Sequence, residues 1–489
     1  MSGIKKQGVT NTFLSYIGAF LGYLIVYFQP YFIHAEDIGL VRILYSFAFV
    51  SSTLMSLGFS NFILRYFPKI KSESTKNHGL FGLIIWINIV GFLLVFSILL
   101  ALKSHVFSYY NYSDGLTTYY FHAILTGLVI SISLILSIYC NCLFRTTYMV
   151  FLNEVFTRIL QFVVLFAFYF GWINHESFII GNLLVYFLQL LLIAIYFIRL
   201  KLFTFKVDWS FFKNFNTKDL IFSSVLMTLT SFISLSARFV DQLQIAHFLN
   251  QAQVGIYSTC IIIPMLLEIP LRNIERIAQP KLAHYWENKQ LYDINSLYKK
   301  SSKYLFFVGS LLFLGLISGV DILFSFLPKE YLIGKLPMII IAISILFNLL
   351  SGINSAIVVV SHKYYILTIG LVLQLALQLL LNNIMVPIYG INGAAFSTLI
   401  GFVFFNCMML LYNYIRFNIH PFSKSIGVIF LGLTLLLSIH YTILINLYSL
   451  IRISIEMLLI LILFSFLSYR FKIIEEVNVF LNKYILKSK

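Results

Sequence analysis

Charged residues are scarce in this sequence. Only 11% of its 489 residues are Asp, Glu, Lys or Arg, whereas 60% are hydrophobic and 17% are aromatic. Soluble globular domains carry about a quarter charged residues, so this composition excludes a chain of soluble domains, although its length would allow several. It is typical of a polytopic membrane protein.

Cysteines are also few. Cys140, Cys142, Cys260 and Cys407 all lie in apolar segments. The C-N-C spacing at residues 140–142 fits neither a zinc site nor a CxxC redox motif. We interpret all four as buried packing residues, and we expect no metal and no cofactor.

Apolar segments of about 20 residues, each long enough for a membrane helix, alternate with short polar turns. We expect fourteen transmembrane helices, near residues 10–34, 40–64, 79–102, 116–144, 150–172, 177–199, 220–248, 255–278, 303–327, 336–360, 365–387, 391–415, 426–446 and 453–470. The first stretch is longer than a signal-peptide core and lacks a small-residue cleavage site, so we expect it to be retained.

Basic residues are distributed very unevenly between the two sets of loops. With the N-terminus inside, 27 of the 34 Lys and Arg residues fall in inner loops and tails and five in outer loops, which leaves Arg158 and Arg238 within the membrane. This positive-inside pattern places both termini in the cytoplasm. It also explains most of the net charge of +16, so we expect no nucleic-acid partner.

The chain contains a weak internal repeat. The segments "FGWINHESFIIGNLLVYFLQLLL" and "YGINGAAFSTLIGFVFFNCMMLL" both pass from a Gly-containing outer turn through Ile-Asn into a long apolar helix that ends in Ile-Arg. Parallel repeats of this kind are found in transporters, whose substrate sites lie between the halves. We therefore expect an N-lobe at 1–200, an interfacial cytoplasmic linker at 201–219, a C-lobe at 220–415, and a C-terminal helix pair with a tail at 416–489.

Three stretches carry a resemblance to a known family. They are "EDIGLVRILYSFAFVSSTLMSLGFSNFILRYFPK", "VDQLQIAHFLNQAQVGIYS" and "LNNIMVPIYGINGAAFSTLIG". Together they resemble the Wzx-type O-antigen and polysaccharide flippases of the multidrug/oligosaccharidyl-lipid/polysaccharide (MOP) exporter superfamily. The resemblance extends along essentially the whole chain and includes the fourteen-helix count, so it implies an all-α fold of two six-helix lobes plus two C-terminal helices.

The resemblance implies a bacterial inner-membrane protein that flips an undecaprenyl-pyrophosphate-linked oligosaccharide, such as an O-antigen, capsule or exopolysaccharide unit, by alternating access. It implies no covalent chemistry, and the sequence offers neither a D-x-D motif nor a large outer loop for catalysis. The expected partners are the lipid-linked oligosaccharide, membrane lipid and a polysaccharide polymerase or length regulator, with a monomer as the working unit. A lipid II flippase and a MATE-like cation-coupled multidrug antiporter remain alternatives.

Pyrophosphate recognition calls for arginine, whose forked guanidinium stays charged in a partly dry site. The segment "PMLLEIPLRNIERIAQPK" holds the best candidates, Arg272 and Arg276, with Pro264 and Pro270 expected to kink the helix. A simple Glu268 to Arg272 bridge is an equally good interpretation. Arg65 and Arg145 are interpreted as ordinary helix-end residues.

The remaining candidates are polar groups inside apolar helices. They comprise Arg158, Arg238, Gln374 and Gln378 for substrate binding, and Asp241, Glu268 and Glu154 for coupling or gating by Na⁺ or H⁺. Arg238 and Asp241 share a helix face at i, i+3, so a mutual ion pair is the alternative to a coupling role. Hydrogen bonds between helices are the alternative for the two glutamines.

Overall fold

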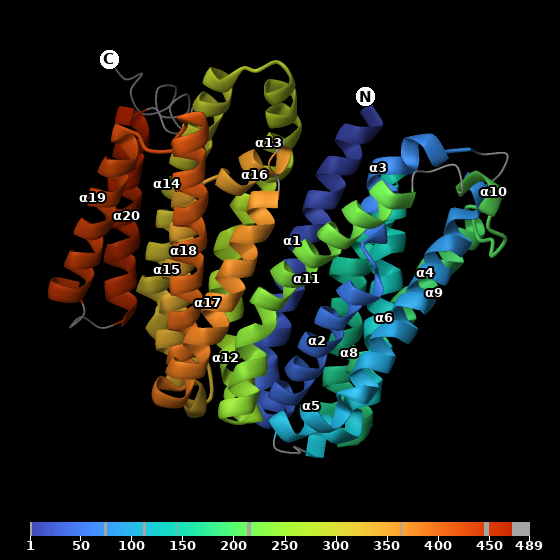
Figure 1. Ribbon diagram of the computed structural model, residues 1–489. Coiled ribbons are helices and arrows are strands. Elements are labelled where there is room, and N and C mark those ends of the chain that lie inside the picture. Colours follow the sequence, from blue (N-terminus) through green and yellow to red (C-terminus); the bar gives the residue numbers. More distant parts are fainter. Residues whose placement is uncertain are drawn as a thin grey trace. The chain divides into compact units, whose positions relative to one another are not determined.

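The computed structural model describes residues 2–72, 76–110, 114–143, 145–212, 217–361, 363, 365–444 and 449–471, and all regular elements in these ranges are helical (Figure 1). Thirteen of the described helical segments are long and apolar enough to cross a membrane. A further helix, α11 at Thr217–Phe248, occupies the position of the expected seventh span. The expectation of an all-α, multi-pass membrane protein is confirmed.

The chain folds into two compact units, residues 1–258 and 259–489. The boundary falls within the helix α12, Gln251–Met265. This division follows the contacts between helices. The lobes expected at 1–200 and 220–415 follow from an internal sequence repeat, which the contacts do not test, so the repeat stays a prediction.

Unit 1 is a bundle in which α2 packs against α4, α6 and α11, and α1 packs against α8. Its elements are α1 (Ser2–Phe32), α2 (Ala35–Met55), α3 (Phe59–Ile70), η1 (Asn77–Gly79), α4 (Leu80–Ala101), α5 (Lys103–Tyr109), α6 (Asp114–Cys142), α7 (Thr146–Val150), η2 (Phe151–Phe156), α8 (Thr157–Tyr169), α9 (His175–Arg199), α10 (Trp209–Phe212), α11 and the first half of α12.

Unit 2 is a second bundle, in which α18 packs against α15 and α17, and α14 packs against α15, α19 and α20. Its elements are η3 (Leu266–Glu268), α13 (Ile269–Glu287), α14 (Leu291–Ser325), η4 (Lys329–Gly334), α15 (Lys335–Ser351), α16 (Asn354–Val360), α17 (Tyr365–Tyr389), α18 (Ile391–Phe417), α19 (Lys424–Ile439), η5 (His440–Leu444) and α20 (Ser449–Phe471). Figure 1 shows α19 and α20 together at one edge of this unit.

Several spans expected as single helices are interrupted. The expected kink near Pro264 and Pro270 is confirmed, because a 3₁₀ turn, η3, separates α12 from α13. The spans expected at 40–64 and 336–360 are also divided, at Gly58 and Gly352, whose φ angles of 70° and 65° favour glycine. Broken helices of this kind are common in transporters.

Glycines also let helices touch backbone to backbone. A Cβ on Gly39 of α2 would lie 1.8 Å from the carbonyl oxygen of Gln251, and a Cβ on Gly255 of α12 would lie 2.0 Å from the carbonyl oxygen of Ala35. In lipid there is no hydrophobic driving force between helices, and small residues instead let the backbones approach closely enough for van der Waals packing. The start of α2 and the start of α12 are therefore held in direct contact within unit 1.

The linker after α9 is docked against the start of α4. His78 Nδ1 lies 2.9 Å from Asp208 Oδ2, and the His78 ring stacks on Phe211 at 3.6 Å between ring centres. The hydroxyl of Ser210 and, next, the imidazole of His78 hold the pKa of the Asp208 carboxyl at about 2. The expected interfacial stretch is thus anchored to unit 1 by a polar contact and an aromatic stack.

Candidate functional site

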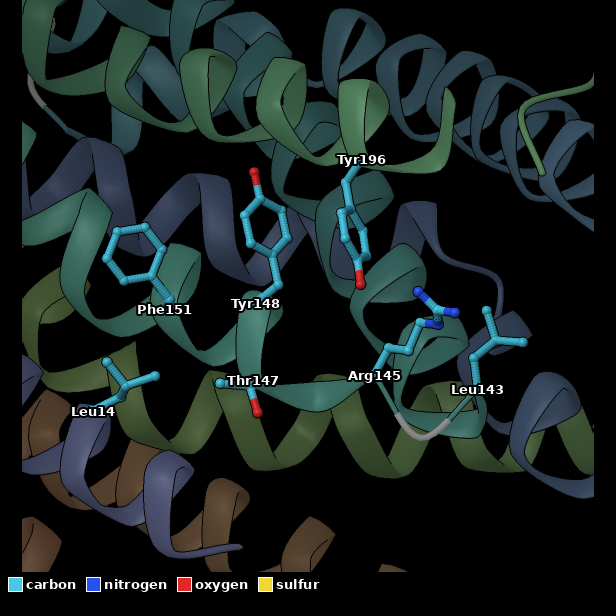
Figure 2. A pocket seen from close by; sticks show the side chains of 7 residues that line it. All are labelled: Leu14, Leu143, Arg145, Thr147, Tyr148, Phe151 and Tyr196. Carbon is cyan, nitrogen blue, oxygen red and sulfur yellow. The ribbon is translucent and has the colours of Figure 1, made fainter. Parts of the chain in front are cut away.

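A large pocket opens in unit 1 where α6 ends, α7 begins and α9 finishes. Its volume is about 750 Å³, which lies in the range of small-molecule sites. The lining side chains are Leu14, Leu143, Arg145, Thr147, Tyr148, Phe151 and Tyr196 (Figure 2). The pocket therefore combines one guanidinium, hydroxyl groups and apolar walls.

Two tyrosines form one side of this pocket. The rings of Tyr148 and Tyr196 stack with centroids 4.4 Å apart, and Figure 2 shows the Tyr196 hydroxyl directed to the side where Arg145 lies, with Leu14 and Phe151 at the other end. Stacked aromatic faces with polar tips suit ligands that have one apolar face and many hydroxyl groups. A guanidinium beside them suits a phosphate.

A polar network surrounds Arg158 in the same unit. Its Nη1 donates to Gln161 Oε1 at 3.0 Å, and the Gln161 amide donates to the Tyr45 hydroxyl at 3.3 Å. Tyr45 in turn donates to the carbonyl oxygen of Asn182 at 2.9 Å. Arg158 is half-buried, so the network fixes a cationic group among α2, α8 and α9.

Helix α1 lies directly over Arg158 and Glu154. A Cβ on Gly18 would be 2.8 Å from the Glu154 Cβ, and a Cβ on Gly22 would be 3.6 Å from Arg158 Nε. Two glycines one helical turn apart therefore make room for the two charged residues predicted for this half. Glu154 itself is exposed.

Glu154 belongs to a π-helical segment, η2, between the pocket and Arg158. Within it Asn153 accepts a hydrogen bond from the buried Gln189 of α9 and lies 3.4 Å from Ser137 of α6. Single π-turns inside helices are frequent at functional sites. Here the segment places an amide group where α6 and α9 meet.

Arg238 and Asp241 differ in their surroundings. Arg238 is exposed, whereas Asp241 is 5% exposed and its Oδ2 accepts a hydrogen bond of 2.7 Å from the Tyr257 hydroxyl. The neighbouring Gln242 accepts a hydrogen bond from Ser46 of α2 at 2.7 Å. A buried carboxylate with a tyrosine donor is suited to bind a cation or a proton, and the coupling role of Asp241 stays a prediction.

In unit 2, Arg272 and Glu268 form the bridge that was the simple alternative for this helix. Arg272 Nη2 lies 2.6 Å from Glu268 Oε2, and the arginine side chain is 50% exposed. Glu268 is only 15% exposed, so the bridge is partly shielded from water, and the role of Arg272 in pyrophosphate binding stays a prediction. Arg276, one turn further along, is exposed as well.

Gln374 and Gln378 face helix α18. Gln378 is fully buried and donates to Thr398 at 2.7 Å, and the side chain of Gln374 packs beside Gly401. This geometry matches hydrogen bonding between helices, which was the alternative interpretation of these residues. Their role in substrate binding stays a prediction.

Sequence reasoning assigned Arg145 to an ordinary helix end and did not consider Tyr148, Tyr196 or Tyr45. The signal for the pocket lies in "FRTTYMV", where an arginine, two hydroxyl residues and a tyrosine follow one another at the end of an apolar span. The network beyond Gln161 carries no such signal, because Tyr45 lies on another helix and is separated from Gln161 by 116 residues.

Comparison with solved structures shows which class of protein this fold defines. The structure is similar to the lipid II flippase MurJ in an inward closed conformation, with a TM-score of 0.72, 17% sequence identity, and coverage of 96% of this chain and 99% of that chain. It is also similar to the Vibrio cholerae MATE transporter VcmN, with a TM-score of 0.54, 13% identity, and coverage of 86% and 98%. At these identities the likeness shows the fold, which is that of the MOP transporters.

The family follows from the sequence itself. The family model described as "Polysaccharide biosynthesis protein" matches residues 5–274, more than half of the chain, and the chain belongs to this family. The resemblance to the polysaccharide branch of the MOP superfamily is thereby confirmed. No curated protein matches the sequence significantly.

Proposed function

We propose that the protein flips an undecaprenyl-pyrophosphate-linked oligosaccharide from the cytoplasmic to the periplasmic leaflet of the bacterial inner membrane by alternating access. The observation that carries the proposal is the combination of a transporter fold with membership in a polysaccharide biosynthesis family. The positive-inside distribution of Lys and Arg supports cytoplasmic termini.

The pocket around Arg145 supports the kind of substrate. On the proposed orientation it opens at the cytoplasmic end of unit 1, where a newly made lipid-linked sugar would arrive. Its volume of about 750 Å³ accommodates a sugar-pyrophosphate head group, with Arg145 for phosphate and the stacked tyrosines for sugar faces. Leu14 and Phe151, at the end away from Arg145, offer an apolar surface for the first isoprene units.

The other charged and polar candidates then receive roles as parts of the same proposal. Arg158 and Arg238 in unit 1 and Arg272 and Arg276 in unit 2 attend the pyrophosphate, while Gln374 and Gln378 contact sugar hydroxyls. Asp241, Glu268 and Glu154 couple or gate the movement with H⁺ or Na⁺. The protein requires no cofactor in this scheme, works as a monomer, and hands its product to a polymerase or length regulator.

Gene deletion in the host tests the proposal. The expected result is loss of surface polysaccharide, with the polyprenyl-linked glycan trapped on the cytoplasmic leaflet, and restoration by the wild-type gene. Normal surface polymer in the deletion strain, with altered drug sensitivity, would overturn the proposal in favour of a MATE-like antiporter.

The similarity to MurJ supports a lipid II-type flippase as the second candidate, because MurJ is the solved structure that matches with a TM-score of 0.72 over 96% of the chain. The two candidates differ in the consequence of depletion. A lipid II flippase is needed for cell-wall synthesis, so its loss should cause lysis, whereas loss of a polysaccharide flippase should leave cell shape intact. Rescue of a strain depleted of its lipid II flippase would support the second candidate.

A further inference from the structure

A buried acid and a buried base meet in the C-terminal helix pair of unit 2. His440 Nδ1 lies 2.6 Å from Glu456 Oε1, and the two side chains are only 9% and 6% exposed. His440 begins the π-helical segment η5, and Glu456 lies about two turns into α20. Ionisable side chains within membrane-spanning helices cost free energy, so a buried pair of this kind is a candidate functional site.

The neighbouring cations of this unit bind a different carboxylate. Arg452, one turn before Glu456 on α20, is 4% exposed and donates to Asp321 of α14 at 2.5 Å, and Lys335 of α15 also binds Asp321. Tyr441 sets its ring at right angles to His440, 4.7 Å away between centres. Asp321 therefore has two cationic partners, whereas the Glu456 carboxylate faces a histidine whose charge depends on a proton.

The space beside the pair fits no ligand larger than a water molecule. A cavity of about 10 Å³ borders both side chains and is otherwise lined by leucines and isoleucines of α14, α19 and α20 together with Ser318. That is about the volume one water requires. Glu456 Oε2 is buried and receives no hydrogen bond from any described residue, and the described residues contain no group of three or more metal-ligating side chains. The space is therefore about the size of one water molecule, which could carry a proton to or from the pair.

We propose that His440 and Glu456 together hold one exchangeable proton, and that this proton, in addition to the ion assigned to Asp241, is coupled to the transport step; this second part rests on the function proposed above. Without the proton, neutral His440 and ionised Glu456 carry one negative charge. Uptake of a proton from water by the Glu456 carboxylate, whose O–H then faces His440 Nδ1, makes the pair neutral overall, and its return to water restores the negative charge. Because the pair joins η5 to α20, a change in its charge alters the contact between these two helical segments.

The proton site is tested first without any transport assay. Infrared difference spectra of the purified protein, recorded over roughly pH 4 to 9, the range in which glutamates in proteins take up a proton, report the carbonyl stretch of a protonated carboxyl group shielded from water. The expected result is a pH-dependent band that disappears in E456Q, shifts its midpoint in H440N, and is unchanged in E287Q, which alters an exposed glutamate of the same unit. Persistence of the band in E456Q, or its absence from the wild type, would overturn the site.

The use of the proton is tested in proteoliposomes loaded with a fluorescent polyprenyl-linked sugar. The expected result is that an imposed pH gradient accelerates flipping by the wild type and by E287Q, and that E456Q and H440N lose this acceleration while retaining their fold by circular dichroism. Acceleration that survives in both variants would overturn the coupling. If the wild type flips nothing, the proposed substrate is wrong, whereas the infrared result still decides whether the pair binds a proton.

Discussion

The hydroxyl of Tyr257 donates a hydrogen bond to the buried carboxylate of Asp241 across 2.7 Å. The two side chains stand on consecutive helices, α11 and α12, and both are nearly inaccessible to water. Asp241, which the sequence predicts to be a coupling residue, therefore has a specific hydrogen-bond donor in Tyr257. Replacing Tyr257 removes this hydrogen bond and leaves the carboxylate in place, whereas replacing Asp241 removes the carboxylate itself.

The Asp241 pair yields the first prediction. Asp241→Asn should abolish glycan export, because the amide cannot hold a coupling cation or proton, while Tyr257→Phe should retain export and lower the stability by about 1.5–3 kcal/mol, the contribution of a hydrogen bond to a charged group. Complementation of the deletion strain and thermal unfolding in detergent provide the two readouts. Full export by the Asp241→Asn variant would mean that this carboxylate serves packing alone.

The Arg145 pocket yields the second prediction, which concerns substrate binding. Arg145→Ala should weaken binding of a short-chain polyprenyl-pyrophosphoryl sugar to the purified protein by roughly tenfold, because a charge-assisted hydrogen bond is lost. Tyr148→Phe keeps the stacked ring and should have little effect on binding, whereas Tyr148→Leu removes the ring and should weaken binding. Lys289→Ala, which removes an exposed charge outside the pocket, is the matched control, and equal weakening in that variant would assign the loss to net charge.

Helix contact in unit 1 supplies a prediction about folding. Gly39→Ala should destabilise the protein by about 1–3 kcal/mol, the usual cost of overpacking, because the new Cβ would meet the Gln251 carbonyl oxygen at 1.8 Å. Gly319→Ala in α14 is the control, since a Cβ there meets nothing within 4 Å and alanine favours the helix by up to about 1 kcal/mol. Chemical denaturation in mild detergent measures both; similar values for the two variants would refute the close contact.

The docked linker predicts how its anchorage depends on pH. Because the pKa of Asp208 is lowered to about 2, the carboxylate stabilises docking fully above about pH 4, and this contribution fades only as the pH falls toward 2. Trp209 adjoins Asp208, so a protein that retains Trp209 as its single tryptophan reports docking by fluorescence anisotropy. The anisotropy should not change near pH 4, where an ordinary Asp carboxyl takes up its proton, should fall only toward pH 2, and should be lower in Asp208→Asn above about pH 4. A wild-type transition near pH 4 would show that Asp208 titrates normally.

The architecture could be read from the sequence because its determinants are local. Membrane helices are recognised from the length and hydropathy of an apolar segment. Pro264 and Pro270 correctly predicted the interruption between α12 and α13. Gly171 and Gly390, matched as outer turns, both have positive φ angles of 71° and 60°. The divisions at Gly58 and Gly352 were missed, because one glycine in an apolar run does not distinguish a break from a close helix contact.

The site was less predictable, because its contacts join distant parts of the chain. The pairing of Arg272 with Glu268 follows from i, i+4 spacing and was anticipated as an alternative. Arg452 was assigned to an outer loop, yet α20 begins at Ser449 and buries it against Asp321, 131 residues earlier. No spacing rule connects such residues, and only the fold shows which charges compensate one another.

The π-helical segment at Phe151–Phe156 has a consequence for the geometry of unit 1. Each residue of an α-helix advances the helical phase by about 100°, and a π-turn accommodates an additional residue. Deleting one residue from this segment would restore regular α-helix and leave Arg158 in nearly the same orientation relative to Tyr148, whereas regular α-helix of the same length would turn Arg158 by about 100°. The π-helical segment therefore sets the orientation of Arg158 about the helix axis relative to the pocket residue Tyr148. Regular α-helix of the same length would not give this orientation.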